Sequence, residues 1–151
     1  MGVRMTDEEA WTFLERGHTA ILTTLRRDGW PVSLPLWYVV TGEVIHVATP
    51  TRSKKITRIT NDDRACLLVE SGDEWASLAA VELPVRALVL PPDAEAELAL
   101  AAFDHKYAPF RPARAAMPES AVSRYASQTV IRLEPAGPFL TWDNAKLSRK
   151  R

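Results

Sequence analysis

The stretch Thr49-Pro50-Thr51-Arg52-Ser53-Lys54-Lys55-Ile56-Thr57-Arg58-Ile59 combines a helix start with an unusual concentration of positive charge. The apolar run Val44 to Ala48 leads into it and predicts a strand. Thr51 is a suitable N-cap, and Ile56 and Ile59 repeat at helical spacing. We therefore expect a strand that runs directly into a helix beginning near Thr51.

Three cations, Arg52, Lys54 and Lys55, then fall in the first turn of this helix. The start of a helix is already partly positive, and its backbone N–H groups lack intrahelical acceptors, so it favours anions. Lysine amines, hydroxyl groups and free N–H groups are the partners that a phosphate group prefers. The stretch therefore predicts a phosphate site. The alternative is a cluster of three solvated surface cations.

The composition limits the class of protein. The 151 residues carry balanced charge, with Lys+Arg 19 against Asp+Glu 19, which indicates one domain and no general affinity for nucleic acid. The single cysteine, Cys66, lies in an apolar run, so a core position is expected and a disulfide within the chain is excluded. No secretory signal or long apolar span is present, which predicts a cytoplasmic protein without a membrane segment.

Strand patterns dominate the chain, and helical patterns flank them. Thr6 and Glu9 form a capping box for a first helix that Gly17 ends. Strands are expected at 19–25, 32–40, 43–49, 65–71, 75–90 (bent or interrupted at Pro84), 129–134 and 139–142. Helices at 94–107 and 119–125 form a helical insertion at about 93–125 of a single domain, 1–151.

Short turns between the strands, such as the Asp28-Gly29 hairpin, predict a mainly β fold with flanking helices, in which six or seven antiparallel strands form a small barrel. The second strand, 32–40, is apolar on both faces. One small barrel cannot cover both faces, so we expect one of them to meet another subunit or a flat ligand.

The usual catalytic constellations are missing. His18, His46 and His105 are scattered without metal-ligand spacing, so no metal site is expected, and His46 is expected to be a structural residue within a strand. The acidic pairs Asp62-Asp63 and Asp73-Glu74 occupy turns and are expected to be solvated. No catalytic side chain can be assigned, and an enzyme of this kind would take its reactive group from a cofactor that carries a phosphate.

These features together resemble a known family. A strand, the Asp28-Gly29 hairpin, the Val32 to Tyr38 strand, the motif Thr49-x-x-x-Ser53-x-Lys55 and the turn from Asn61 to Ala65 occur in the order of the pyridoxamine 5′-phosphate oxidase-like split barrels. These include flavin/deazaflavin oxidoreductases that bind FMN or the deazaflavin F420. The resemblance covers most of residues 17–90, and the strands from Thr129 onward, with Trp142-Asp143, agree with the family's C-terminal end.

The resemblance implies a homodimer of split β-barrels with two cofactor sites at the interface. The residues that would hold the phosphate are Thr49, Ser53, Lys54 and Lys55. The residues that would line the isoalloxazine or deazaflavin ring, largely through their backbone, are Ser33, Leu34, Pro35 and Leu36. Ser77, expected on the fifth strand, and Trp142 would close the site; docking of the C-terminal tail is the alternative role of Trp142.

Two departures from the family pattern matter. Leu83 stands where the family often has glycine, so the alignment of the fifth strand is shifted by up to a residue or two. The segment Trp142-Asp143-Asn144 lacks the arginine that true pyridoxamine phosphate oxidases carry beside this tryptophan. Oxidation of pyridoxamine phosphate itself is therefore not expected.

The resulting hypothesis is an oxidoreductase that moves a hydride between bound FMN or F420 and a small organic substrate. A composition rich in alanine, arginine and proline favours F420 over FMN. The arginines expected to form a groove for its acidic tail are Arg26, Arg27, Arg52 and Arg58. The alternative is a non-catalytic flavin- or haem-binding carrier, which needs no acid or base.

Overall fold

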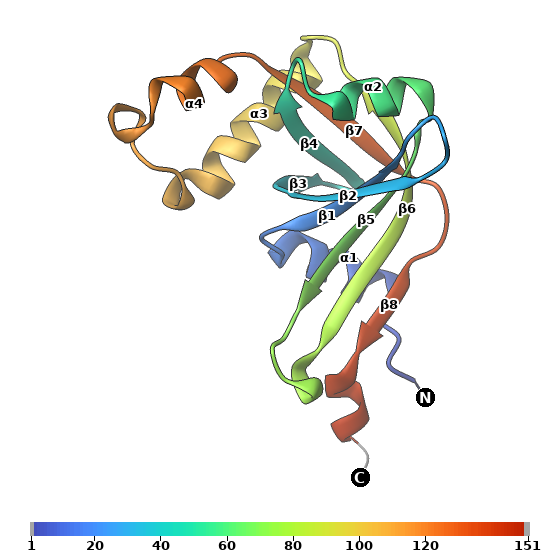
Figure 1. Ribbon diagram of the computed structural model, residues 1–151. Helices are drawn as coiled ribbons and strands as arrows, with labels where there is room; N and C mark the ends of the chain where they lie inside the picture. The colour runs from blue at the N-terminus through green and yellow to red at the C-terminus, as the bar shows by residue number, and fades with distance from the viewer. Residues whose placement is uncertain (1, 150–151) are drawn as a thin grey trace.

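The computed structural model describes residues 2–149; Met1, Lys150 and Arg151 lie outside the described part. It is built on one eight-stranded sheet in which neighbouring strands are antiparallel, in the order β2-β1-β5-β6-β7-β4-β3, with β8 paired to β6 (Figure 1). The strands are β1 (Ala20–Leu25), β2 (Pro31–Leu36), β3 (Tyr38–Thr41), β4 (Val44–Pro50), β5 (Arg64–Ser71), β6 (Ala79–Val89), β7 (Gln128–Pro135) and β8 (Leu140–Asp143). The helices are α1 (Asp7–Arg16), α2 (Lys54–Asn61), α3 (Ala94–Tyr107) and α4 (Glu119–Arg124), and short 3₁₀ turns join some of the elements.

The mainly β, antiparallel split-barrel fold is thus confirmed, with one more strand than expected. The predicted strand 32–40 divides at Trp37 into β2 and β3, which take the two ends of the strand order. The Trp37 ring stacks on Tyr107 of α3, with ring centroids 4.2 Å apart, so this residue turns out of the strand to pack on a helix. Within residues 2–149 no ladder joins β2 to β3, and the barrel stays open there.

The expected strand 75–90 is shorter than predicted. Residues Trp75–Ser77 form a 3₁₀ turn and β6 begins only at Ala79. Gly72, at φ 95°, lets the chain turn sharply beneath this segment. Pro84 does not interrupt β6, because it lies between the residues paired with β8 (79–82) and those paired with β7 (85–89), where its missing N–H is not needed.

The core fills the inside of the curved sheet and is closed by α1. The expected capping box is present: the Glu9 N–H donates to the Thr6 hydroxyl, and the Thr6 N–H donates to the Glu9 carboxylate at 2.8 Å. α1 then places Ala10 and Leu14 in the core, both fully buried. Gly17 ends the helix, as predicted.

The residues between β6 and β7 carry α3 and α4, which project to one side of the sheet (Figure 1). The prediction of a helix at 94–107 outside the barrel is confirmed. Tyr107, fully buried, anchors its C-terminal end: its hydroxyl accepts from the Tyr38 N–H at 2.9 Å and can donate to the carbonyl oxygen of His18 or Tyr38. The helical insertion is therefore attached firmly at its α3 end.

Candidate anion-binding site at the start of α2

β4 delivers the chain to α2 in a tight connection at one end of the barrel (Figure 1). Thr49, 2% exposed, ends the buried part of the strand, and the Ser53 N–H donates to the Pro50 carbonyl oxygen at 2.9 Å. The N-cap is Ser53, whose hydroxyl accepts from the Lys55 N–H at 3.2 Å. The expected N-cap at Thr51 is therefore wrong by two residues, and only Lys54 and Lys55 of the three cations lie in the first turn.

Thr51 has another role in the structure. Its hydroxyl and that of Ser127 lie 2.9 Å apart, and the hydroxyl of Thr129 donates to it at 3.1 Å. The Thr51 N–H also donates to the Ser127 carbonyl oxygen at 3.1 Å. The helical insertion therefore returns to the sheet beside the start of α2, and three hydroxyl groups gather there.

The charge at the start of α2 is uncompensated. The first turn contains no acidic residue, and no ion pair joins Lys54 or Lys55 to a carboxylate anywhere in residues 2–149. Asp62 and Asp63, which could have paired with Lys55, form ion pairs with Arg64 and Arg86 instead. Lys54 is exposed and Lys55 half-buried.

Burial first, and the charge of Arg58 second, lower the pKa of the Lys55 amine. Arg58, which was expected in a groove for an acidic cofactor tail, lies on the same face of α2 as Lys55 and makes a contact that the sequence did not predict. It follows Lys55 by three positions, and its Nε donates to the buried Thr24 hydroxyl on β1 at 2.9 Å. The sequence spacing could have predicted that Arg58 lies beside Lys55, because residues three positions apart share a helix face.

The predicted ring-lining residues lie on β2, at the end of the strand order. Ser33, Leu34 and Pro35 are exposed and Leu36 is half-buried. The hydroxyls of Ser33 and Thr23 are 2.7 Å apart across the β1–β2 pair. Since Thr24, the next residue of β1, holds Arg58, β1 connects the β2 stretch to the start of α2. α2 is therefore bonded to β1, which pairs with β2, whereas β2 and β4, the strand that carries Thr49, stand near opposite ends of the strand order.

Ser77 and Trp142 lie elsewhere. Ser77 is in the 3₁₀ turn before β6, not on the strand as expected, and its hydroxyl donates to the Glu74 carbonyl oxygen at 3.0 Å. Trp142 pairs with Ala80 at the same end of β6. At roughly 3.3 Å per residue, β5 separates this end from the end of α2 by about 23 Å. The whole of α2 lies at the opposite end of the sheet from β8 (Figure 1), so one chain does not bring Ser77 or Trp142 to the start of α2.

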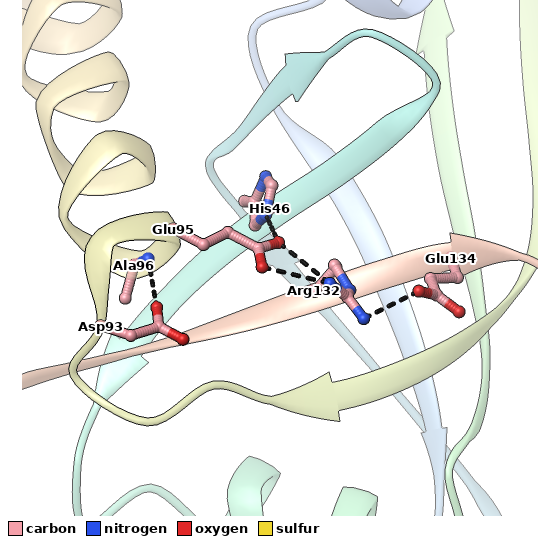
Figure 2. A network of polar contacts seen from close by, with 6 residues as sticks. All are labelled: His46, Asp93, Glu95, Ala96, Arg132 and Glu134. Carbon is pink, nitrogen blue, oxygen red and sulfur yellow. Dashed lines mark hydrogen bonds and ion pairs between the residues drawn. The ribbon is translucent and has the colours of Figure 1, made fainter.

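His46, expected to be structural, belongs to a polar network that ties α3 to the sheet (Figure 2). Its Nε2 lies 2.9 Å from Glu95 Oε1, and Arg132 bridges Glu95 and Glu134 at 3.1 and 2.9 Å. His46 is 5% exposed, and its Nδ1 has no hydrogen-bond partner in the described structure. The burial and the strand position fit the structural role, with one ring nitrogen unsatisfied.

Other possible centres contribute little. Among residues 2–149 no group of three or more His, Cys, Asp or Glu side chains is placed to hold a metal ion. A cavity of about 520 Å³ lies between α1 and the far end of β5, where Phe13, Gly17 and Val69 line it, and it includes none of the predicted site residues.

Cys66 is half-buried and not fully in the core, and burial raises the pKa of its thiol to about 12. No helix in the described part of the chain has the length and apolar character needed to cross a membrane.

Comparison with known proteins agrees with this architecture. The family model for pyridoxamine 5′-phosphate oxidase matches residues 6–136. A conserved hypothetical protein of Mycobacterium tuberculosis is 21% identical and superposes with a TM-score of 0.81, covering 99% of this chain and 91% of its own. No curated protein matches the sequence.

Two other solved structures share the fold at lower identity. An FAD-binding protein of Mesorhizobium loti has a TM-score of 0.69 and 18% identity, covering 91% of this chain and 94% of its own. The haem storage protein HutZ of Vibrio cholerae has a TM-score of 0.65 and 14% identity, covering 94% of this chain and 96% of its own. At these identities the likeness establishes the fold alone.

Proposed function

The chain belongs to the pyridoxamine 5′-phosphate oxidase family, and on that premise we propose that it is a flavin- or deazaflavin-dependent oxidoreductase. It binds FMN or F420 and transfers a hydride to or from a small organic substrate. The observation that carries this proposal is the uncompensated positive charge at the start of α2, where hydroxyl groups, backbone N–H groups and two lysines face no carboxylate partner.

The donor set at the start of α2 fits a phosphate group. In the proposal, the residues that hold the phosphate are Thr49, Ser53, Lys54 and Lys55. The residues that line the ring through the exposed edge of β2 are Ser33, Leu34, Pro35 and Leu36. The bound flavin or deazaflavin supplies the hydride chemistry. The protein orients the ring and excludes water, and no side chain is assigned as a catalytic acid or base.

We propose further that the protein works as a homodimer. The registers place Pro35, Ile21, Leu68, Glu82 and Leu140 in one row across β2, β1, β5, β6 and β8. Four of these five side chains are apolar, and all are exposed or half-buried. A second copy covering this face would bring its own Ser77 and Trp142 toward the first copy's cofactor, which one chain cannot do.

The choice between FMN and F420 depends on the arginines. The structure gives three of the four predicted groove residues partners: Arg26 pairs with Asp28, Arg27 donates to Asn61 at 3.4 Å, and Arg58 donates to Thr24. These partners do not join the arginines to one another, and the preference for F420 rests on composition. Both cofactors stay in the proposal, as does the cytoplasmic location.

The second candidate is a carrier that binds a flavin or haem without turnover. It is favoured by the absence of any titratable side chain in the β2 stretch 33–36, and by structural relatives described as an FAD-binding protein and a haem storage protein. Parallel titrations with FMN, F420 and haem identify the ligand. Turnover of the loaded protein with a reductant then separates the enzyme from the carrier. A protein that binds neither FMN nor F420 would contradict the proposed function.

A further inference from the structure

Arg58 is held in an unusual way for a surface arginine. Its side chain is half-buried, and its Nε donates a hydrogen bond of 2.9 Å to the hydroxyl of Thr24, a residue only 1% exposed. This bond holds the guanidinium against β1 near Thr24. Within residues 2–149 its two terminal nitrogens form no ion pair with a carboxylate. Two pairs of N–H donors are therefore available on a fixed plane.

Arg58 and Lys55 are three residues apart, so their side chains share one face of α2. Their like charges repel each other in partly desolvated surroundings, where repulsion is stronger than in water. The nearest carboxylates in the sequence, Asp62 and Asp63, are bound to Arg64 and Arg86. The folded chain therefore holds two cations together with nothing to neutralise them, an arrangement that a bound anion stabilises.

We propose that Arg58, fixed by Thr24, is a second cationic contact for the cofactor's phosphate and makes the site select phosphorylated over unphosphorylated ring compounds. A guanidinium offers two parallel N–H groups to a phosphate, whereas a lysine offers a point charge. The two residues thus supply different parts of the recognition. This inference rests on the proposed function, since it assumes that the start of α2 holds the phosphate.

The alternative role for Arg58 is a structural link between α2 and β1. The two roles predict different results for phosphate selectivity. A structural link stabilises the fold, so its removal lowers the thermal midpoint and leaves phosphate selectivity unchanged. A cofactor contact acts on binding, so Arg58→Gln weakens binding of the phosphorylated compound and lowers the selectivity for phosphate, whatever the lost bond to Thr24 does to the midpoint.

The experiment measures the binding affinities of two pairs of compounds: FMN with riboflavin, and F420 with its unphosphorylated deazaflavin chromophore. The variants are compared on the pair that the wild type binds. For Arg58→Gln we expect affinity for the phosphorylated compound to fall about ten- to a hundredfold, with little change for the unphosphorylated one. Thr24→Val, which keeps the shape and removes the hydroxyl, should weaken phosphorylated binding by a smaller factor. Arg4→Gln removes an exposed positive charge elsewhere and should change neither affinity.

Lys55→Ala separates the two proposals. If Lys55→Ala weakens binding and Arg58→Gln does not, the role of Arg58 is wrong and the phosphate site stands. If neither variant weakens binding, or the wild type binds no compound of either pair, the phosphate site itself is wrong. Equal losses for phosphorylated and unphosphorylated compounds in Arg58→Gln would assign Arg58 to the ring or to the fold, and would overturn the selectivity.

Discussion

The hydroxyl of Tyr38 occupies the space beside Gly17, where a β-carbon would lie 2.1 Å from it. Tyr38 is fully buried, and its hydroxyl donates to the carbonyl oxygen of Leu14 in the last turn of α1. The close approach fastens the end of α1 to the start of β3. Glycine is required at position 17 for space, because its backbone lies at an ordinary φ of −67°.

Gly17→Ala is therefore expected to destabilise the fold by roughly 1–3 kcal/mol, because the methyl group displaces a buried ring. Chemical denaturation of wild type and variant measures the effect. Tyr38→Phe removes the clashing oxygen together with its hydrogen bond, so in the double variant the cost of the alanine should shrink. A Gly17→Ala protein as stable as the wild type would show that the contact relaxes freely.

Lys55→Ala is expected to weaken binding of FMN or F420 by about ten- to a hundredfold, the effect of losing a charge-assisted contact worth roughly 1.5–3 kcal/mol. The stability of the cofactor-free protein should hold or rise. The pKa of Lys55 is lowered in the folded state, so its charged form disfavours folding, and the start of a helix is an unfavourable place for a cation.

A cofactor titration and a thermal melt of the free protein measure these two opposite effects. A lysine paired with Asp62 or Asp63 would have given the reverse pattern, but the structure pairs those carboxylates with arginines. Unchanged affinity for both cofactors in Lys55→Ala would remove the phosphate-site assignment.

The His46–Glu95–Arg132 network predicts a pH-dependent contribution to stability (Figure 2). The hydrogen bond from His46, then those from Arg132, hold the pKa of Glu95 below its ordinary value of 4.5. A carboxyl group whose pKa is lower in the folded state stabilises the fold above its ordinary pKa. That contribution is lost as the pH falls through the lowered value.

Glu95→Gln should consequently melt below the wild type at neutral pH, and the difference should shrink as the pH falls below about 4.5. Thermal melts across this range measure it. Glu97→Gln is the matched control, because Glu97 is exposed on the same helix and no ion pair is recorded for it in the described structure. A Glu95→Gln difference that stays constant with pH would mean that the network contributes through packing alone.

Local patterns were enough to predict most elements of the fold. The capping box at Thr6 and Glu9 and the Asp28-Gly29 hairpin each depend on a few neighbouring residues. The errors arose where distant contacts decide. Thr51 was expected to cap α2 but bonds Ser127, which is 76 residues away, and Ser53 takes the cap.

The candidate site shows the same limit. The cations at the start of α2 were visible as a motif, but the bond between Arg58 and Thr24 joins residues 34 positions apart and could not be read from spacing. Pro84 was expected to bend or interrupt its strand, and the pairing of β6 with two different strands on either side of it explains why the strand is not interrupted. The position of Ser77 depended on a turn set by Gly72.

The proposed dimer gives the last prediction. Leu140, 65% exposed, and Trp142, 48% exposed, alternate on β8 with the buried Thr141, so both lie on the outer face of the sheet. If a second copy covers that face, Leu140→Glu adds a charge beside Glu82, its partner in the register, and the interface would have to bury both. We expect the wild type to be a dimer by light scattering at micromolar concentration, and Leu140→Glu to be a monomer with an unchanged fold by circular dichroism.

The cofactor affinity of monomeric Leu140→Glu should be lower than that of the dimeric wild type, because in the proposal Ser77 and Trp142 reach the ring only from the second copy. Leu98→Glu is the control, since Leu98 is 72% exposed on α3, away from this face. A monomeric wild type would contradict the proposed dimer. A monomeric Leu140→Glu that binds cofactor as tightly as the wild type would show that one chain makes the whole site.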